Sequence, residues 1–205
     1  MINQLIIKGF KSFVDKSINF NQLNVLTGLN SSGKSTVIQA LQILNKYSRH
    51  FENPLIEGHG DYKELQNPFS SLPFSINAKY GEHGIICYSP QKENNIHTEE
   101  FPDLIIISAD RYGPLVSIPL LSDCELGSKG ENVIKCIQVH ENDILGKLIT
   151  HPNSEGDTFL YNLRAWLGTI TPGVQFNYDI IDKADTSFSL FNGYRAKNVG
   201  FGLSY

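Results

Sequence analysis

The sequence predicts a mixed α/β fold, with one strand–loop–helix unit surrounded by antiparallel strands. Two observations support this prediction. A glycine-rich loop at residues 28–35 lies between a short apolar run and a stretch in which apolar residues recur at helical spacing. Several other segments alternate apolar and polar residues and are separated by short turns, which is typical of antiparallel strands. Strands and helices do not alternate strictly, unlike in the small kinases that contain such a loop.

The chain opens with three predicted strands. Residues 2–7 form the first, and a turn at residues 9–13 leads into the second near residues 17–20. This hairpin is followed by residues 23–27, a short apolar run that predicts a buried strand ending at the glycine loop.

The loop itself matches the pattern G-x-x-x-x-G-K-[ST] at every position from Gly28 to Ser35. From ordinary residue frequencies, a chance match in a chain of this length is roughly a one-per-cent event. The residues after the loop predict a helix, because apolar side chains recur three or four positions apart, at Val37, Ile38, Leu41, Leu44 and Tyr47. The alternative is a glycine-rich turn before an ordinary helix.

The residue types in the loop fit phosphate binding. Gly28 and Gly33 permit backbone angles that turn successive N–H groups inward, and the following helix directs its positive end to the same place. Lys34 adds a positive charge for the β- and γ-phosphates, and the Ser35 hydroxyl is the expected Mg²⁺ ligand. The predicted site for ATP and Mg²⁺ consists of Gly28, Asn30, Ser31, Ser32, Gly33, Lys34, Ser35 and Thr36.

The rest of the chain alternates connections, hairpins and helices. Residues 51–73 are rich in Asn, Gly, Pro and Ser and predict a long surface connection. Residues 104–107 form a continuous apolar run that predicts a strand buried on both faces. The remaining predictions are hairpin strands at 74–80 and 84–88, helices at 131–139 and 157–167, and strands at 174–181 and 186–191.

Composition bounds the class of protein. With 205 residues, 40% of them hydrophobic and 19% charged, the chain predicts one globular domain rather than a disordered protein. The formal net charge of −4 gives no general attraction to nucleic acid or membrane. Three widely spaced cysteines and the absence of a signal peptide predict a cytoplasmic protein with reduced thiols and no membrane partner. Six scattered histidines show no zinc-ligand spacing and are expected on the surface or in loops.

Several segments resemble a known group of ATPases. Residues 6–13 and 26–41 resemble the opening of the RecF/SMC-type ABC ATPases. Within that class, residues 107–114, 127–132 and 198–205 resemble bacterial AAA-family ATPases related to the OLD proteins, so the resemblance runs from end to end. Many members of that group act in phage defence or DNA maintenance.

The resemblance implies a nucleotide-bridged dimer. Residues 198–205 occupy the place of the ABC signature motif, which in the family reaches the γ-phosphate of a nucleotide held by the opposite subunit. Gly200 and Gly202 allow close backbone approach, and Ser204 offers a hydroxyl near a helix start. The implied partner is a second copy or another ATPase subunit, with DNA or an effector nuclease as a further partner. The alternative is a glycine-bearing turn without a ligand.

The chain departs from the family in its acidic residues. In the family, the Walker B strand follows the signature segment, whereas this sequence ends at Tyr205. Residues 1–205 are therefore expected to be an incomplete ABC-type domain, with strands, loop and helix in 1–50 and a β-rich insert, two helices and the signature-like segment in 51–205. The only candidate for the Walker B aspartate within the chain is Asp110. It comes two residues too late after the apolar run 104–107, and it is followed by Arg111 where the motif has a Glu. These two residues are expected to form a turn and ion pair at a strand end. No glutamine in the position of a Q-loop can be assigned, because Gln138 lies in a predicted helix.

Three functions remain open from the sequence. The first is an ATPase subunit that dimerises head to tail, and the second is a nucleotide-binding module without hydrolysis. A GTPase is the third, since residues 143–146 match D-x-x-G; however, residues 45–48 lack the aspartate of N-K-x-D and fall in the predicted helix.

Overall fold

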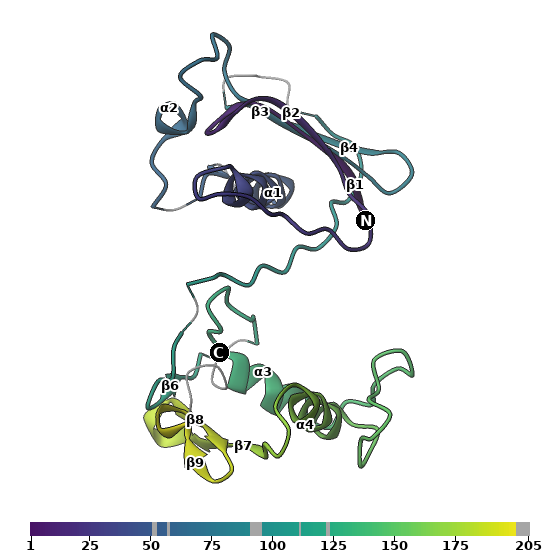
Figure 1. Cartoon of the computed structure of the whole chain (residues 1–205), viewed down its shortest axis with the longest axis vertical. Coiled ribbons are helices and arrows are strands. Elements are labelled where there is room, and N and C mark those ends of the chain that lie inside the picture. Colours follow the sequence, from purple (N-terminus) through teal and green to yellow (C-terminus); the bar gives the residue numbers. More distant parts are fainter. Residues whose placement is uncertain (51–52, 57, 91–95, 111, 122–123, 200–205) are drawn as a thin grey trace. The chain divides into compact units, whose positions relative to one another are not determined.

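The fold consists of two compact units. A computed structural model describes residues 1–50, 53–56, 58–90, 96–110, 112–121 and 124–199. The chain divides into unit 1, Met1–Leu104, and unit 2, Ile105–Tyr205 (Figure 1). The boundary lies inside the predicted part 51–205, so the strands between residues 75 and 97 belong to the same unit as the glycine loop.

Unit 1 is built on an antiparallel sheet. In the described residues its strand order is β2-β1-β3-β4-β5, and each neighbouring pair is antiparallel. The strands are β1 Ile2–Phe10, β2 Phe13–Asn19, β3 Ser75–Tyr80, β4 Gly84–Tyr88 and β5 Ile96–His97. Both predicted hairpins of this unit are confirmed, since β1 pairs with β2 and β3 pairs with β4.

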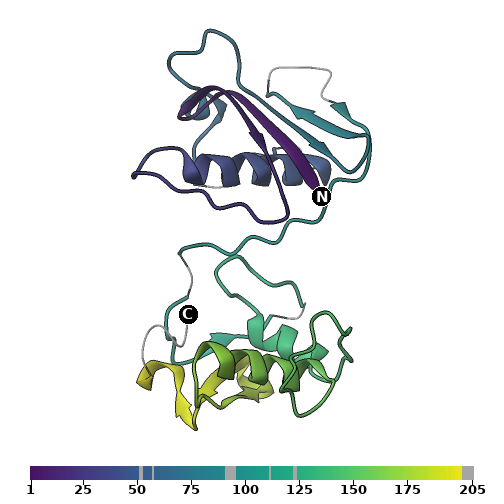
Figure 2. The ribbon, with the colours of Figure 1, turned by 45° about the vertical axis from the view of Figure 1, so that its right-hand side comes forward.

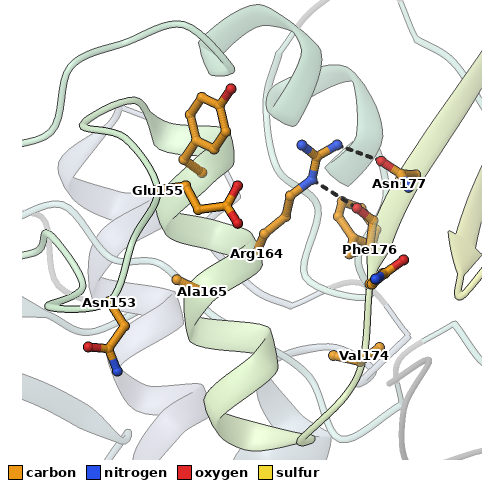
Figure 3. A pocket seen from close by; sticks show the side chains of 9 residues that line it. Asn153, Glu155, Arg164, Ala165, Val174, Phe176 and Asn177 are labelled. Atoms are coloured by element: carbon orange, nitrogen blue, oxygen red, sulfur yellow. Dashed lines mark hydrogen bonds between the residues drawn. The ribbon is translucent and has the colours of Figure 1, made fainter.

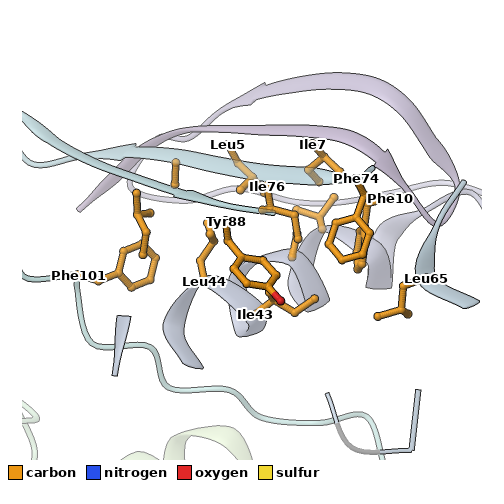
Figure 4. Close-up of a cluster of buried hydrophobic side chains, with 14 of the residues drawn as sticks. Leu5, Ile7, Phe10, Ile43, Leu44, Leu65, Phe74, Ile76, Tyr88 and Phe101 are labelled. Carbon is orange, nitrogen blue, oxygen red and sulfur yellow. The ribbon is translucent and has the colours of Figure 1, made fainter. Parts of the chain in front are cut away.

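Helix α1, Lys34–Ser48, covers one face of this sheet (Figure 1). The predicted helix is confirmed, and the residues that face the sheet are fully buried. Figure 4 shows the side chains of Ile43 and Leu44 pointing toward the strands. They meet alternate residues of β1 and β3, because successive side chains of a strand point to opposite faces. The buried members of this core include Leu5, Ile7, Phe10, Val37, Ala40, Ile43, Leu44, Phe74 and Ile76.

The connection between α1 and β3 is only partly the surface loop that the sequence predicts. It contains a short helix, α2 Tyr62–Leu65, whose first turn is capped by the Asp61 carboxylate, which accepts from Lys63 N at 2.8 Å. Leu65 is buried in the core of unit 1 and Asn67 is 4% exposed. Leu65 adds apolar area to the core, which offsets the entropy lost in ordering this segment.

In its described residues, unit 2 combines two α-helices with a second antiparallel sheet of order β6-β8-β7, with β9 also paired to β8 (Figure 2). Its elements are β6 Ile118–Pro119, α3 Val133–His140, α4 Phe159–Ile170, β7 Phe176–Ile181, β8 Thr186–Phe191 and β9 Tyr194–Arg195. The predicted helices and the final hairpin are confirmed, with a 3-10 turn at Asp182–Ala184 between the strands.

Polar contacts connect the helices of unit 2 to its sheet. The Tyr178 hydroxyl of β7 donates to the Glu141 carboxylate at the end of α3. Burial, followed by this hydrogen bond, raises the pKa of Tyr178 to about 12, so the phenol remains a donor at neutral pH. On α4, Arg164 Nε donates to the Phe176 carbonyl at 3.0 Å.

One histidine differs from its prediction. His151 is 8% exposed rather than a surface residue. Its Nδ1 accepts from Asn153 N at 3.0 Å, and its Nε2 lies 2.8 Å from the Thr169 hydroxyl. The ring also meets Trp166 edge-on at 4.6 Å between centroids. Satisfied ring nitrogens allow this burial, which sequence spacing does not reveal.

The predicted strand at residues 23–27 is wrong. The segment is not hydrogen-bonded as a strand, and Leu23 and Val25 are 82% and 75% exposed. At its start, Asn24 makes a local turn with Asn21, since Asn24 Oδ1 accepts from Asn21 N at 3.0 Å and Asn24 Nδ2 donates to Asn21 O at 2.8 Å. An apolar run becomes a buried strand only where a neighbouring strand pairs with it, and no described residue does so here.

The buried strand predicted at 104–107 is also wrong. Ile105 and Ile107 are 80% and 66% exposed, and none of these residues lies in a strand. The division between the two units falls at this point, after Leu104. The run therefore connects two units instead of occupying the centre of one sheet.

Within the described part of the chain, no helix has both the length and the apolar character needed to cross a membrane.

Two isoleucines of α1 differ in burial and are therefore expected to differ in their contribution to stability. Ile43 is fully buried, whereas Ile38 is 46% exposed. Ile43→Ala is expected to lower the free energy of unfolding by about 2–5 kcal/mol, because it leaves a cavity. Ile38→Ala is expected to change it by less than about 1 kcal/mol. Urea denaturation of both variants checks this, and equal losses would show that α1 does not pack as described.

Candidate functional site

The glycine loop ends where α1 begins. Gly33 is the N-cap residue of α1, with φ 98°, and Lys34 is the first helical residue. Gly28 and Ser31 also have positive φ, 148° and 63°. The loop contains a tight turn in which Ser32 N donates to Leu29 O, three residues earlier, at 3.2 Å. The N–H groups of the first helical turn are thus directed out of the helix end, where an anion is favoured.

Gly33 lies directly against the turn between β1 and β2. A Cβ atom at this position would lie 2.6 Å from Phe13 Cζ and 2.8 Å from Ser12 Oγ. Both the positive φ and this close approach require glycine. The helix start and the hairpin turn are therefore in contact through a residue without a side chain.

The hairpin turn is fixed by the segment that follows α2. Lys11, with φ 49°, donates its N–H to Leu65 O at 2.8 Å. The buried Asn67 donates its side-chain amide to Lys11 O at 2.6 Å and its backbone N–H to Gly9 O at 2.8 Å. These bonds satisfy the backbone of a tight turn and hold it beside the loop.

Lys34 is held by its own loop. Its Nζ donates to Gly28 O at 2.8 Å and to Leu29 O at 2.7 Å. A lysine ammonium has three donors, so these two bonds leave one N–H for an anion at the loop. The lysine is thus positioned by backbone carbonyls.

The loop, the helix start and the hairpin turn line an open cavity of about 260 Å³. Six of the predicted site residues line it: Ser31, Ser32, Gly33, Lys34, Ser35 and Thr36. Gly28 is outside the lining but bonds to Lys34, and Asn30 is exposed in the loop without a place on the cavity wall. The structure therefore brings most of the predicted residues together around one space.

Two further residues, which lie outside the loop motif and were not predicted, line the cavity. Lys11 and Ser12 come from the β1–β2 turn. Lys11 Nζ donates to Gln39 Oε1 of α1 at 2.9 Å, and Ser12 Oγ lies 3.4 Å from Thr36 Oγ1. The only sequence signal for these two residues is a lysine next to a serine in the predicted turn. That signal does not predict the site, because the turn lies beside α1 only once β1 has paired with β2 and the sheet has packed on the helix.

The lining is suited to an anion. It contains two lysines and several hydroxyls, and no described carboxylate lies on its wall. The Ser35 side chain is exposed and free to approach a cation that accompanies phosphate oxygens. The described residues contain no group of three or more acidic, His or Cys side chains placed to hold a metal. The Ser35 hydroxyl lies on the cavity wall and is of a type that can serve as one ligand of a Mg²⁺ ion shared with a bound phosphate group.

A family comparison agrees with this geometry. Residues 1–166 match the family model of the AAA ATPase domain. The chain belongs to the AAA ATPase domain family. The match spans unit 1 with its loop and cavity and continues into unit 2. No curated protein matches the chain.

Asp110 of this AAA ATPase domain does not lie at a strand end as predicted, because residues 104–107 form no strand. Asp110 Oδ2 pairs with Lys129 Nζ at 2.7 Å in unit 2, where the Asp110 side chain is 81% exposed and the Lys129 side chain 44%. Its expected partner, Arg111, lies outside the described residues. Gln138 lies in α3, as predicted, where its Oε1 accepts from Lys135 at 3.0 Å. The signature-like residues Gly200, Gly202 and Ser204 lie outside the described residues.

The residues of the GTPase alternative are engaged elsewhere in the AAA ATPase domain. Asp143 Oδ2 lies 2.7 Å from His140 Nδ1, and Asp143 O accepts from Phe159 N at 2.8 Å. Residues 45–48 lie inside α1. Neither segment lines the cavity at the glycine loop.

The contact at Gly33 leads to a prediction that separates backbone strain from close approach. Gly58 also has positive φ, 76°, but a Cβ there meets nothing within 4 Å. Gly58→Ala is expected to cost about 1–2 kcal/mol of unfolding free energy from strain alone. Gly33→Ala is expected to cost at least about 1 kcal/mol more, because the methyl group overpacks Phe13 and Ser12. Chemical denaturation of both variants measures the difference, and equal losses would contradict the described contact.

Proposed function

We propose that this AAA ATPase domain binds ATP with Mg²⁺ at the loop of residues 28–35. The observation that supports this most directly is the cavity where Lys11 and Lys34 meet the N-terminus of α1. Two ammonium groups, the helix end and the hydroxyls provide the positive field that a triphosphate requires. Family membership supports nucleotide binding independently of this geometry.

Each part of the loop has a role in this proposal. The backbone N–H groups from Ser32 to Ser35 surround phosphate oxygens, and the third donor of Lys34 reaches the β- and γ-phosphates. Mg²⁺ would take the Ser35 hydroxyl together with phosphate oxygens and supply charge neutralisation. The carbonyl groups of Gly28 and Leu29 already hold the Lys34 side chain, so it loses little conformational entropy when the nucleotide binds.

Lys34→Ala tests the assignment of the loop. Removing one charge-assisted contact is expected to cost about 1.5–3 kcal/mol, which weakens ATP affinity about tenfold or more. The matched control is Lys16→Ala, an exposed lysine of β2 outside the cavity, which is expected to leave affinity unchanged. Titration with a fluorescent ATP analogue in the presence of Mg²⁺ measures both. Unchanged affinity in the Lys34 variant would overturn the assignment.

A second candidate function is nucleotide binding without turnover. The observation that favours it is the absence of a carboxylate from the cavity wall among the described residues. Phosphate release by the same preparation distinguishes the two functions. Release above the Lys34→Ala background supports an ATPase, whereas tight binding without release supports a binding module.

The ABC-type class of this ATPase domain is part of the same proposal. The resemblance of residues 6–13 and 26–41 to RecF/SMC-type and OLD-related ATPases supports an ABC-type arrangement. Hydrolysis would reset a conformational switch, with its output in phage defence or DNA maintenance through DNA or an effector nuclease.

The proposed dimer is head to tail, with Gly200, Gly202 and Ser204 reaching the nucleotide of the opposite subunit. ATP with Mg²⁺ is then expected to shift the chain from monomer to dimer in analytical ultracentrifugation. Ser204→Arg is expected to prevent the shift, because a long cation enters a closely packed interface, while ATP binding by the monomer persists. Dimerisation that the variant leaves intact would contradict the role of this segment.

A further inference from the structure

Unit 2 contains a cavity that the proposed ATP site does not explain. It has a volume of about 360 Å³ and is formed by the loop after His151, by α4 and by the start of β7 (Figure 3). This volume lies in the range of small-molecule sites. The cavity contains a fixed cation, an anion that pairs with no described residue, and an apolar wall.

The cation is Arg164 of α4. Its Nε donates to Phe176 O at 3.0 Å and its Nη2 donates to Asn177 Oδ1 at 2.5 Å, as the dashed lines in Figure 3 show. A guanidinium has five N–H donors in a planar fork, so further donors remain after these two bonds. The side chain is held in one orientation, which reduces the entropy lost when a carboxylate binds to it.

The anion is Glu155, which faces Arg164 across the cavity (Figure 3). Its carboxylate forms neither a hydrogen bond nor an ion pair with any residue that the structure describes. Within the described part of the chain, the Asn153 and Gln175 side chains on the same wall likewise have no protein partner.

The loop that presents Glu155 is rigidly attached to α4. Asn162, with no exposed surface, accepts from His151 N at 2.7 Å and donates to Gly156 O at 3.1 Å and to Thr158 O at 2.9 Å. Ser154 Oγ donates to Gly156 O at 2.7 Å on the other side of Glu155. A fully satisfied buried amide of this kind specifies one loop conformation. The Arg164 side chain and the backbone on both sides of Glu155 are therefore held in place before any ligand binds.

We propose that this cavity binds a free α-amino acid. The ligand carboxylate would pair with the Arg164 fork, its ammonium would pair with Glu155, and its side chain would lie against Ala165, Val174 and Phe176. Opposite charges held on facing walls are complementary to a small zwitterion, whose carboxylate and ammonium satisfy both at once. A nucleotide polyphosphate is disfavoured, because Glu155 would repel it.

Calorimetric titration of the 205-residue chain with each of the twenty standard L-amino acids tests the proposal. At least one is expected to bind with one-to-one stoichiometry and a dissociation constant below about 1 mM. The N-acetyl derivative and the carboxamide derivative of that amino acid each lack one charge. Both are expected to bind at least about tenfold more weakly than the free amino acid. Lys34→Ala is expected to leave this binding unchanged, which makes it independent of the ATP site.

Glu155→Gln is the discriminating variant, since this side chain contributes no described contact to the fold. It is expected to weaken binding about tenfold, whereas Glu82→Gln, an exposed position in the turn after β3, is expected to have no effect. Arg164→Lys keeps the charge but loses the fork, and is also expected to weaken binding. The proposal is overturned if no amino acid binds, if the capped derivatives bind as tightly as the free one, if Glu155→Gln binds normally, or if only a nucleoside such as guanosine binds.

Discussion

The close approach of Gly33 to the β1–β2 turn is the constraint on which the geometry of unit 1 depends. With no side chain at this position, the first turn of α1 contacts Ser12 and Phe13 directly. The same helix then presents Ile43 and Leu44 to the strands, so the core and the loop are aligned by one packing arrangement. Lys11 and Lys34 meet at one cavity as a result, although they come from different elements.

Local features of the sequence predicted the structure well, because their causes are local. The loop pattern and the helical spacing after it fix α1, and alternation with short turns fixes the hairpins. The runs at residues 23–27 and 104–107 could not be assigned by the same reasoning. Whether an apolar run is buried depends on a neighbour in space, and Leu23 and Ile105 are 82% and 80% exposed.

The candidate site shows the same limit. Its glycines, lysine and hydroxyls follow from the motif, since a phosphate-binding loop needs them in that order. Lys11 and Ser12 could not be predicted, because their place depends on the strand pairing and on Asn67, which fixes the turn from a distant part of the chain. His151 and Asn162 in unit 2 are similar: each is buried only because its polar atoms find partners after folding.

The two cavities differ in charge, and this difference determines which ligands each can take. The first has two lysines and no described carboxylate, so it favours a multiply charged anion. The second has one arginine and one glutamate, so its net charge is zero and it favours a dipolar ligand. They belong to different compact units, and neither shares a lining residue with the other. If both ligands bind, any coupling between them must be reciprocal, because the factor by which ATP changes the affinity for the amino acid equals the factor by which the amino acid changes the affinity for ATP.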